Sequence, residues 1–276
     1  MRQLKYINTK GDVIDFRNYN TQIFQGNFHS YEWGYEGTEQ QYGSTVDRFT
    51  KDTLNYEMIV AARGGAKVRE TSLNYMTETT EYDIVNNMQG KLYWGDYYLL
   101  CNILSASVEP SENFFGAEKT MGIFAPYPFW IKELKKHFYP GNSLEESGAV
   151  FDYPYDYNYD YTPAEGGSES WTTNHFAASN FEMVIYGPCI DPKININGYP
   201  YEVFDDVEKG EYIIINSKNT TVTKFRNNGN VADLWDYRAK KYSIFERIPG
   251  GNLNINWSGS FGFDITLYQE RSEPKW

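Results

Sequence analysis

The chain ends with the stretch Gly259-Ser-Phe-Gly-Phe-Asp-Ile-Thr-Leu-Tyr-Gln-Glu-Arg-Ser-Glu-Pro-Lys-Trp276. Within it, every second residue from 261 to 267 is apolar. Because successive side chains of a strand point to opposite faces, this alternation predicts a strand with one buried face. The residues expected on the buried face are Phe261, Phe263, Ile265 and Leu267.

The composition of the whole chain indicates the same class of structure. Hydrophobic residues make up 41% and aromatic residues 18% of the 276 residues, and 25 of them are Tyr. Tyrosine suits a half-buried sheet face, because its ring is covered while its hydroxyl stays near water. We therefore expect a mainly β protein of one large or two ordinary domains, with much of its sheet surface at interfaces.

Neither a membrane segment nor a disulfide is indicated. No window of the sequence approaches 18 apolar residues, so we expect no membrane insertion. Cys101 and Cys189 lie far apart in apolar, strand-like segments. This context favours buried free thiols over a disulfide or a metal site.

The charge of the chain is negative and unevenly distributed. The net charge is −12, with 17 acidic against 14 basic residues in 1–140 and 20 against 11 in 141–276. Wrapping a nucleic acid requires clustered cations that replace its counterions. The sequence therefore disfavours specific nucleic-acid binding, and an acidic surface is most simply a solubility feature.

Residues 1–140 are predicted to form a β-rich domain with a single helix. The helix is expected over residues 67–87, where apolar or small side chains recur at spacings of three and four. Its inward face would carry Leu73, Met76, Thr80 and Ile84. Strands are expected at 4–8 and 13–16 as one hairpin, at 54–62, at 90–94 and 97–104 as a second hairpin, and at 122–130.

Residues 141–276 read as a series of short strands. Gly-containing turns such as Asn197-Gly198 and Asn228-Gly229 separate them. This spacing predicts a β-sandwich or a jelly roll. The expected strands are 181–186, 193–196, 199–203, 211–215, 221–225, 253–257 and 261–267.

Several ordered phrases resemble the distal tail proteins (Dit) of long-tailed phages and prophages. They occur at both ends of the chain, and the last of them runs into the closing stretch 259–276. The phrases are Gly90-Lys-Leu-Tyr-Trp-Gly-Asp-Tyr-Tyr-Leu-Leu-Cys101, Phe124-Ala-Pro-Tyr-Pro-Phe-Trp130, Ile185-Tyr-Gly-Pro188 through Val203, and Ile248-Pro-Gly-Gly-Asn-Leu-Asn-Ile-Asn-Trp-Ser-Gly-Ser-Phe-Gly-Phe-Asp-Ile265.

The resemblance implies a fold and a structural function. It implies a split-barrel-like ring domain over 1–140, followed by a galectin-like β-sandwich over 141–276. The implied function is that of a virion protein at the tail tip, made in the cytoplasm of the bacterial host. It would form a homo-hexameric ring that contacts the tail tube protein, a tail-associated lysin or fibre, and a receptor-binding protein.

A search for catalytic chemistry gives no candidate. The three histidines, at 29, 137 and 175, form no close pair in the sequence, and there is no Gly-x-Ser-x-Gly element or P-loop. We therefore expect no enzyme activity, no cofactor and no metal site. A glycosidase remains only a distant alternative, because no pair of carboxylates can be nominated.

Two groups of aromatic residues are candidate binding residues. Trp171 and Trp235 lie in polar, loop-like contexts and are candidates for stacking on a saccharide, although partly buried edge aromatics explain them more simply. The alternative function is therefore a carbohydrate-binding module that recognises host cell-wall polysaccharide. The second group consists of tyrosines that alternate with polar residues between the two expected domains. This segment is expected either to connect the domains as an extended chain or to contact a neighbouring subunit or partner. The group comprises Tyr153, Tyr155, Tyr157, Tyr159 and Tyr161.

Overall fold

The computed structural model describes residues 3–111, 116–140 and 167–275, and this part of the chain is mainly β with one α-helix. The predicted mainly β class is thus confirmed. The chain divides into two compact units, one of residues 1–132 and 270–276 and the other of residues 133–269. The predicted domain boundary after residue 140 stays a prediction, since residues 141–166 lie outside the described ranges. The tyrosine series at 153–161 lies there too.

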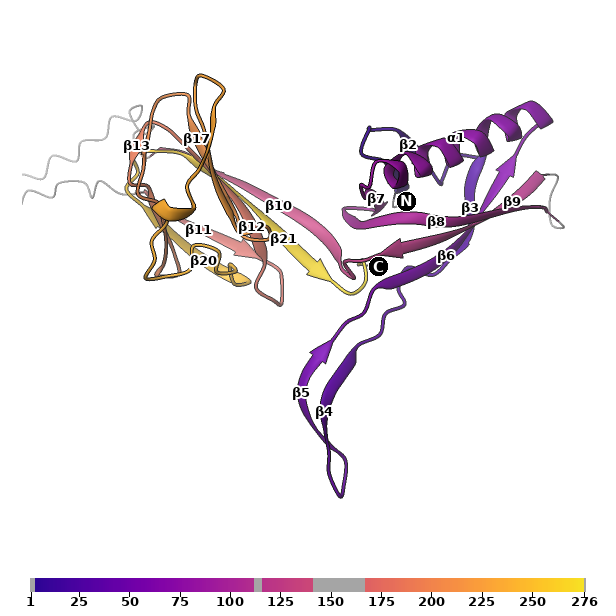
Figure 1. Cartoon of the computed structure of the whole chain (residues 1–276), viewed down its shortest axis with the longest axis horizontal. Helices are drawn as coiled ribbons and strands as arrows, with labels where there is room; N and C mark the ends of the chain where they lie inside the picture. The colour runs from indigo at the N-terminus through magenta and orange to yellow at the C-terminus, as the bar shows by residue number, and fades with distance from the viewer. Residues whose placement is uncertain (1–2, 112–115, 141–166, 276) are drawn as a thin grey trace, which may run out of the picture. The chain divides into compact units, whose positions relative to one another are not determined.

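The first unit is built on antiparallel strands that share one long member, β8 (Figure 1). The first half of β8 pairs with β7, which pairs with β1, and β1 pairs with β2. The second half of β8 pairs with β9, followed by β6 and β3. Both predicted hairpins are present. The elements are β1 (Leu4–Ile7), β2 (Val13–Asp15), β3 (Thr21–Gly26), β4 (Gly34–Glu39), β5 (Ser44–Thr50), β6 (Leu54–Arg63), α1 (Ala66–Val85), β7 (Gly90–Trp94), β8 (Tyr97–Pro110), β9 (Gly116–Ala125) and β10 (Trp130–Phe138), the last of which continues into the second unit.

Helix α1 lies along this sheet, near the position that the sequence predicts (Figure 1). It begins after Gly64, whose φ of +103° ends β6 in a conformation that favours glycine. Met76 and Thr80 face inward as expected, but Ile84 is 40% exposed. The inward position in the last turn is taken instead by Asp83, which is fully buried. The expectation for Ile84 was wrong because polar anchoring, not apolar periodicity, decides that turn.

Asp83 joins the helix to β1. It accepts hydrogen bonds from the Tyr6 hydroxyl (2.6 Å) and from the backbone N–H (2.8 Å) and hydroxyl (2.6 Å) of Thr9. Burial, and then the bond to Asp83, raise the pKa of Tyr6 far above its usual value, so the phenol stays a donor. Gly90 permits this packing, since a Cβ there would lie 2.2 Å from the Tyr6 hydroxyl oxygen.

The second unit is a sandwich of two antiparallel sheets, which confirms the predicted β-sandwich. One sheet has the order β19-β18-β17-β12-β21-β10 and the other the order β11-β20-β14-β15. The elements are β11 (Gly167–Thr173), β12 (Asn180–Tyr186), β13 (Cys189–Ile190), β14 (Lys193–Ile196), β15 (Tyr199–Glu202), β16 (Asp206–Val207), β17 (Tyr212–Asn216), β18 (Thr221–Phe225), β19 (Val231–Asp233), the 3₁₀ turn η2 (Trp235–Tyr237), β20 (Gly251–Trp257) and β21 (Phe263–Arg271), whose end returns to the first unit.

The core of the sandwich contains the side chains that alternate in the sequence. Phe263, Ile265 and Leu267 of β21 are each at most 1% exposed, as their spacing predicts. Fully or almost fully buried residues of β12, β17, β14 and β20 complete the core. Asn197 and Gly198, with φ of +51° and +82°, form the two-residue turn that joins β14 to β15. Both cysteines are buried and free, as predicted.

Candidate assembly surface

A two-stranded hairpin projects from the first unit without a core of its own. We call residues 34–50, which comprise β4 and β5, the arm (Figure 1). Every residue of its two strands is exposed except Thr50, which is partly buried. An isolated two-stranded hairpin is at best marginally stable in water. The arm therefore lacks the packing that stabilises the rest of the unit.

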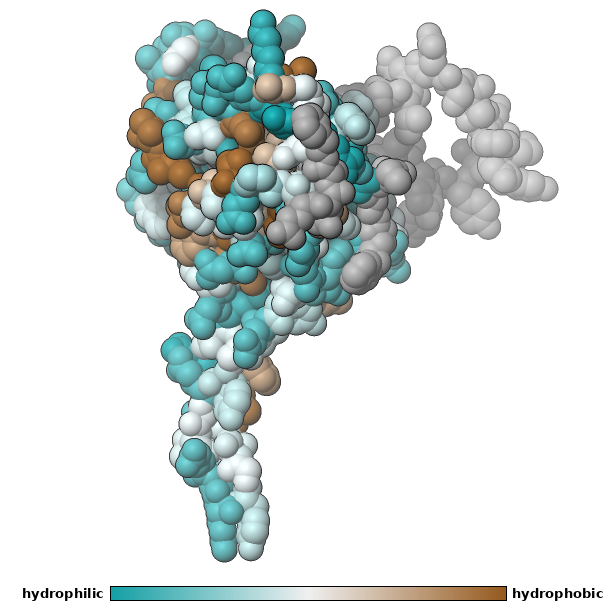
Figure 2. Space-filling view, turned by 90° about the vertical axis from the view of Figure 1, so that its right-hand side faces the viewer, coloured by the Kyte–Doolittle hydropathy of each residue, from teal (hydrophilic) through white to brown (hydrophobic). Residues whose placement is uncertain are grey.

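One face of the arm carries exposed aromatic rings. Tyr35 and Phe49 are direct cross-strand partners, so their side chains share a face, and they are 59% and 69% exposed. Figure 2 shows hydrophobic residues on the flank of the projecting hairpin. The opposite face is polar, with a two-pronged ion pair between Arg48 and Glu36 (2.7 and 2.8 Å). This division into an apolar and a polar face is typical of an element that docks on another surface.

A β-bulge changes the register of the arm at Glu36 and Gly37. A Cβ on Gly37 would lie 2.1 Å from the carbonyl oxygen of Thr45, so any other residue there would force the strands apart. Bulges bend a strand and increase its twist. Gly37 therefore sets the curvature of the arm.

The base of the arm is fixed by an aromatic cluster around Lys51. Its ammonium lies 5.4, 5.3 and 4.5 Å from the ring centres of Tyr31, Trp33 and Phe129. The indole N–H of Trp33 donates to the Ser272 hydroxyl (3.2 Å). Among the described residues, the Lys51 Nζ has no hydrogen-bond partner, and burial lowers its pKa to about 8. These contacts anchor both strands of the arm where they leave the unit.

A second polar cluster lies in the sandwich, around Asp264 of β21. Its carboxylate accepts from the Lys135 ammonium (3.0 Å) and the Tyr186 hydroxyl (2.9 Å), and it lies 2.6 Å from Nδ1 of His137. Burial by itself raises the pKa of this carboxyl. The hydrogen bonds from Lys135, then Tyr186 and His137, outweigh that effect and leave the pKa below its usual range. A hollow of about 380 Å³ adjoins the cluster. Protein donors occupy both carboxylate oxygens, so Asp264 joins β10, β12 and β21 rather than offering an open site.

The two candidate tryptophans lie in different surroundings. Trp171 belongs to β11 and not to a loop as expected, it is 9% exposed, and its ring packs on Phe138 at 6.1 Å. Trp235 lies in η2 and is 40% exposed. Its ring stacks with Phe245 at 5.5 Å, and the Arg238 guanidinium covers it at 3.8 Å. Saccharide stacking on either ring stays a prediction.

The described residues contain neither a metal site nor a membrane helix. In residues 3–111, 116–140 and 167–275, no three His, Cys, Asp or Glu side chains are grouped so that they could hold a metal ion. None of the helices in these ranges combines the length and apolar character that a membrane span requires.

Comparisons with known proteins identify the fold. No family model matches the sequence, and no curated protein matches it either. Among solved structures, the Dit protein of phage SPP1, described as a paradigm of the hub adsorption apparatus in phages that infect Gram-positive bacteria, superposes with a TM-score of 0.63. The match covers 97% of this chain and 99% of that protein at 9% identity. The chain has the Dit fold.

Chains of the phage P2 baseplate in its activated conformation are similar to this chain as well. The structure with Ca matches with a TM-score of 0.59 at 12% identity, and the structure with Sr with 0.57 at 13%. Each match covers 99% of this chain and 100% of the other. The resemblance to Dit proteins found in the sequence is thus confirmed at the level of the fold.

The arm is the feature that the sequence analysis missed. Residues 18–45 are rich in aromatic residues and glycine and predict strands joined by loops, but they do not predict that a hairpin leaves the core. The available signal was the composition of residues 34–50, which are mostly polar and rich in glycine. Such a segment has too few apolar residues to bury a face of its own.

Proposed function

We propose that this chain is a structural subunit of a phage or prophage tail, located at the distal end of the tail. Six copies would form a ring that joins the tail tube protein to a tail-associated lysin or fibre. The ring would also present a receptor-binding protein. It would be made in the cytoplasm of the bacterial host, and catalysis is not part of its proposed role.

The arm is the observation that carries the proposal. Tyr35 and Phe49 expose their rings to water in the single chain, and a neighbouring copy would cover them. An arm that docks on a different surface of the next copy makes a head-to-tail contact. Repeated contacts of this kind close into a ring when the rotation between copies fits.

The matches over nearly the whole chain and the negative charge support the same role. The SPP1 protein is described as a hub of an adsorption apparatus, and the P2 structures are of a baseplate. A net charge of −12 suits a ring through which DNA passes, because the ring would repel phosphates rather than hold them.

The test is the mass of the purified full-length chain by light scattering over a concentration series, with and without the tail tube protein, and negative-stain images of the same samples. We expect a six-fold particle with a central hole and a mass of about 193 kDa, six times the 32.1 kDa of the chain. A monomer at every concentration, even with the tube protein present, would refute the proposal.

The double variant Tyr35→Ser/Phe49→Ser tests the part played by the arm. Both side chains are exposed in the single chain, so the variant should fold normally and lose ring formation. The matched control is Tyr139→Ser/Phe176→Ser, which removes two rings that are 71% and 80% exposed in the sandwich. If both variants assemble like the unmodified chain, the arm is not the assembly element, although the hub role would stand.

A further inference from the structure

A hollow of about 640 Å³ lies in the sandwich, beside the β14–β15 hairpin and the loop 239–242. Its volume is within the range of small-molecule sites. Three cations surround it, namely Lys193 of β14 and Lys240 and Lys241 of the loop. The lining also contains Glu202, which pairs with Lys193 at 3.5 Å. Lys240 pairs with Asp236 at 3.9 Å, and both of these side chains are largely exposed, so water screens this contact.

The loop that carries Lys240 and Lys241 is held at both ends. Before the lysines, the backbone N–H of Ala239 donates to the carbonyl of Glu202 (3.0 Å). After them, the Tyr199 hydroxyl donates to the carbonyl of Ser243 (2.9 Å). A loop fixed in this way loses little conformational entropy when it binds a ligand.

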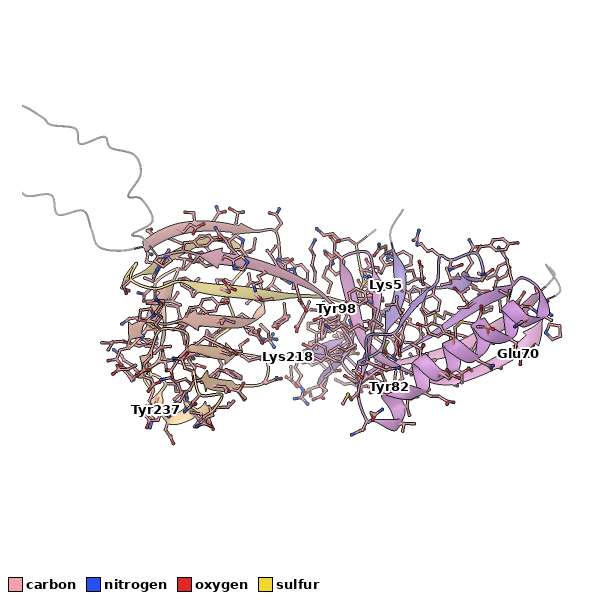
Figure 3. The ribbon with its side chains drawn as sticks, turned by 90° about the horizontal axis from the view of Figure 1, so that it is seen from above. Lys5, Glu70, Tyr82, Tyr98, Lys218 and Tyr237 are labelled. Atoms are coloured by element: carbon pink, nitrogen blue, oxygen red, sulfur yellow. The ribbon has the colours of Figure 1, made fainter. Side chains whose placement is uncertain are left out.

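Aromatic rings lie on the same hollow. Phe204 is 48% exposed and Tyr242 is 43% exposed, and both line it. Tyr242 packs edge-on against Tyr199 at 5.8 Å, which fixes the ring beside the lysines. These rings offer exposed surface, whereas Arg238 covers the ring of Trp235. Tyr237, which Figure 3 labels at the edge of the sandwich, is also exposed, at 52%.

The basic residues are concentrated here in an acidic chain. Residues 238–247 contain four basic residues against one acidic residue, and Lys240 and Lys241 of this segment line the hollow. Residues 141–276 as a whole have 20 acidic and 11 basic residues. A local excess of basic residues on an acidic surface attracts anionic ligands.

We propose that this hollow binds an anionic saccharide. The phosphate or carboxylate group of the ligand lies against Lys240 and Lys241, and its sugar ring lies on Tyr242 or Phe204. Nucleic acid is a poorer ligand, because the hollow offers a compact group of cations and not a track along a backbone. A flat protein partner would need roughly 800 Å² of its own surface in contact, which is far more than a hollow of this size covers.

The experiment is titration calorimetry of the full-length chain at low and moderate salt. The probes are trigalacturonic acid and glucose 6-phosphate as anionic saccharides, galactotriose and glucose as their neutral counterparts, and inorganic phosphate. We expect the two anionic saccharides to bind, and the neutral sugars and inorganic phosphate to bind at least about tenfold more weakly, which is 1.4 kcal/mol. No binding, equal binding of charged and neutral sugars, or equal binding of inorganic phosphate would overturn the proposal.

Two charge-reversal variants test whether the saccharide binds at this hollow. Lys240→Glu/Lys241→Glu should lower the affinity for both anionic saccharides at least about tenfold. Lys209→Glu/Lys218→Glu makes the same change of charge elsewhere in the sandwich and should change it less than about twofold. Equal losses in the two variants would show that net charge and not this hollow holds the ligand. Ring assembly is not required, so the arm variant Tyr35→Ser/Phe49→Ser should bind as well as the unmodified chain, and the two proposals can fail separately.

Discussion

Replacing Asp83 by alanine would remove the acceptor that ties α1 to the first strand. Its carboxylate receives three hydrogen bonds, from the Tyr6 hydroxyl and from the N–H and hydroxyl of Thr9. Tyr6 is fully buried, so its hydroxyl would lose its partner without gaining water. Thr9 is exposed, and water can replace Asp83 for both of its donors.

The burial of Tyr6 and the exposure of Thr9 determine how much unfolding free energy Asp83→Ala should cost. Leaving the buried Tyr6 hydroxyl unpaired costs about 1–3 kcal/mol, and the exchange of the Thr9 bonds for water costs about 0.5–1.5 kcal/mol each. Alanine has the better helix propensity and returns roughly half a kcal/mol. We expect Asp83→Ala to lower the unfolding free energy of the first unit by about 3 kcal/mol.

Hydrogen exchange read peptide by peptide can separate the two units, which a single unfolding midpoint cannot. Peptides from β1 and α1 should exchange about a hundredfold faster in Asp83→Ala, while peptides from β17 keep their rate. The control is Glu78→Ala, which removes an exposed carboxylate from the same helix and should change stability by less than about 0.5 kcal/mol. If Asp83→Ala behaves like Glu78→Ala, the buried carboxylate does not anchor the helix.

Three further changes probe other parts of the molecule. The pKa of Lys51 is about 8 in the folded chain against 10.5 ordinarily, so the unfolded state binds more protons than the folded state between these pH values; the first unit should gain stability as pH rises from 8 to 10.5, in chemical unfolding followed through peptides of the first unit, and Lys51→Met should lose this rise. Folding lowers the pKa of Asp264, so this carboxylate stabilises the chain at pH values above its ordinary pKa and loses that contribution as pH falls through its pKa in the folded state. The difference in unfolding free energy between the unmodified chain and Asp264→Asn should therefore shrink below about pH 4. A difference that does not depend on pH would contradict this. A Cβ on Gly167 would lie 2.3 Å from the ring of Trp257, so Gly167→Ala should destabilise the sandwich by about 1–3 kcal/mol, read from hydrogen exchange in its peptides, and unchanged exchange there would show that β11 shifts freely.

Much of the fold could be predicted from local patterns. The alternation at 261–267, the turn at Asn197-Gly198 and the hairpin at 90–104 all lie where the structure has them. These features depend on neighbours two to four residues away, which the sequence displays directly. The inward position of Ile84 and the loop position of Trp171 were predicted wrongly, because contacts from distant segments decide both. The same periodicity that placed Met76 inward could not show that Asp83 would take the next inward position.

The candidate surfaces were less predictable. The sequence does not show that Tyr35 and Phe49 lack a covering layer, and their exposure in the structure makes them a candidate docking face. Lys240 and Lys241 are ordinary surface lysines until the fold brings them beside Lys193 of β14. Neither surface has a signature of spacing, because each is assembled from segments that meet only after folding.

The sequence by itself determined that this is a mainly β chain with one helix, free buried thiols and an acidic surface, since each follows from composition or from short-range periodicity. Its ordered phrases also pointed to the Dit fold. The tertiary structure alone decided which polar groups are buried together and which apolar groups are left outside. Tyr6 and Asp83 are 77 residues apart, and His137 and Asp264 are 127 residues apart. Such pairs form only when the whole sheet closes, because burying a charged group is favourable only where folding supplies all its partners at once.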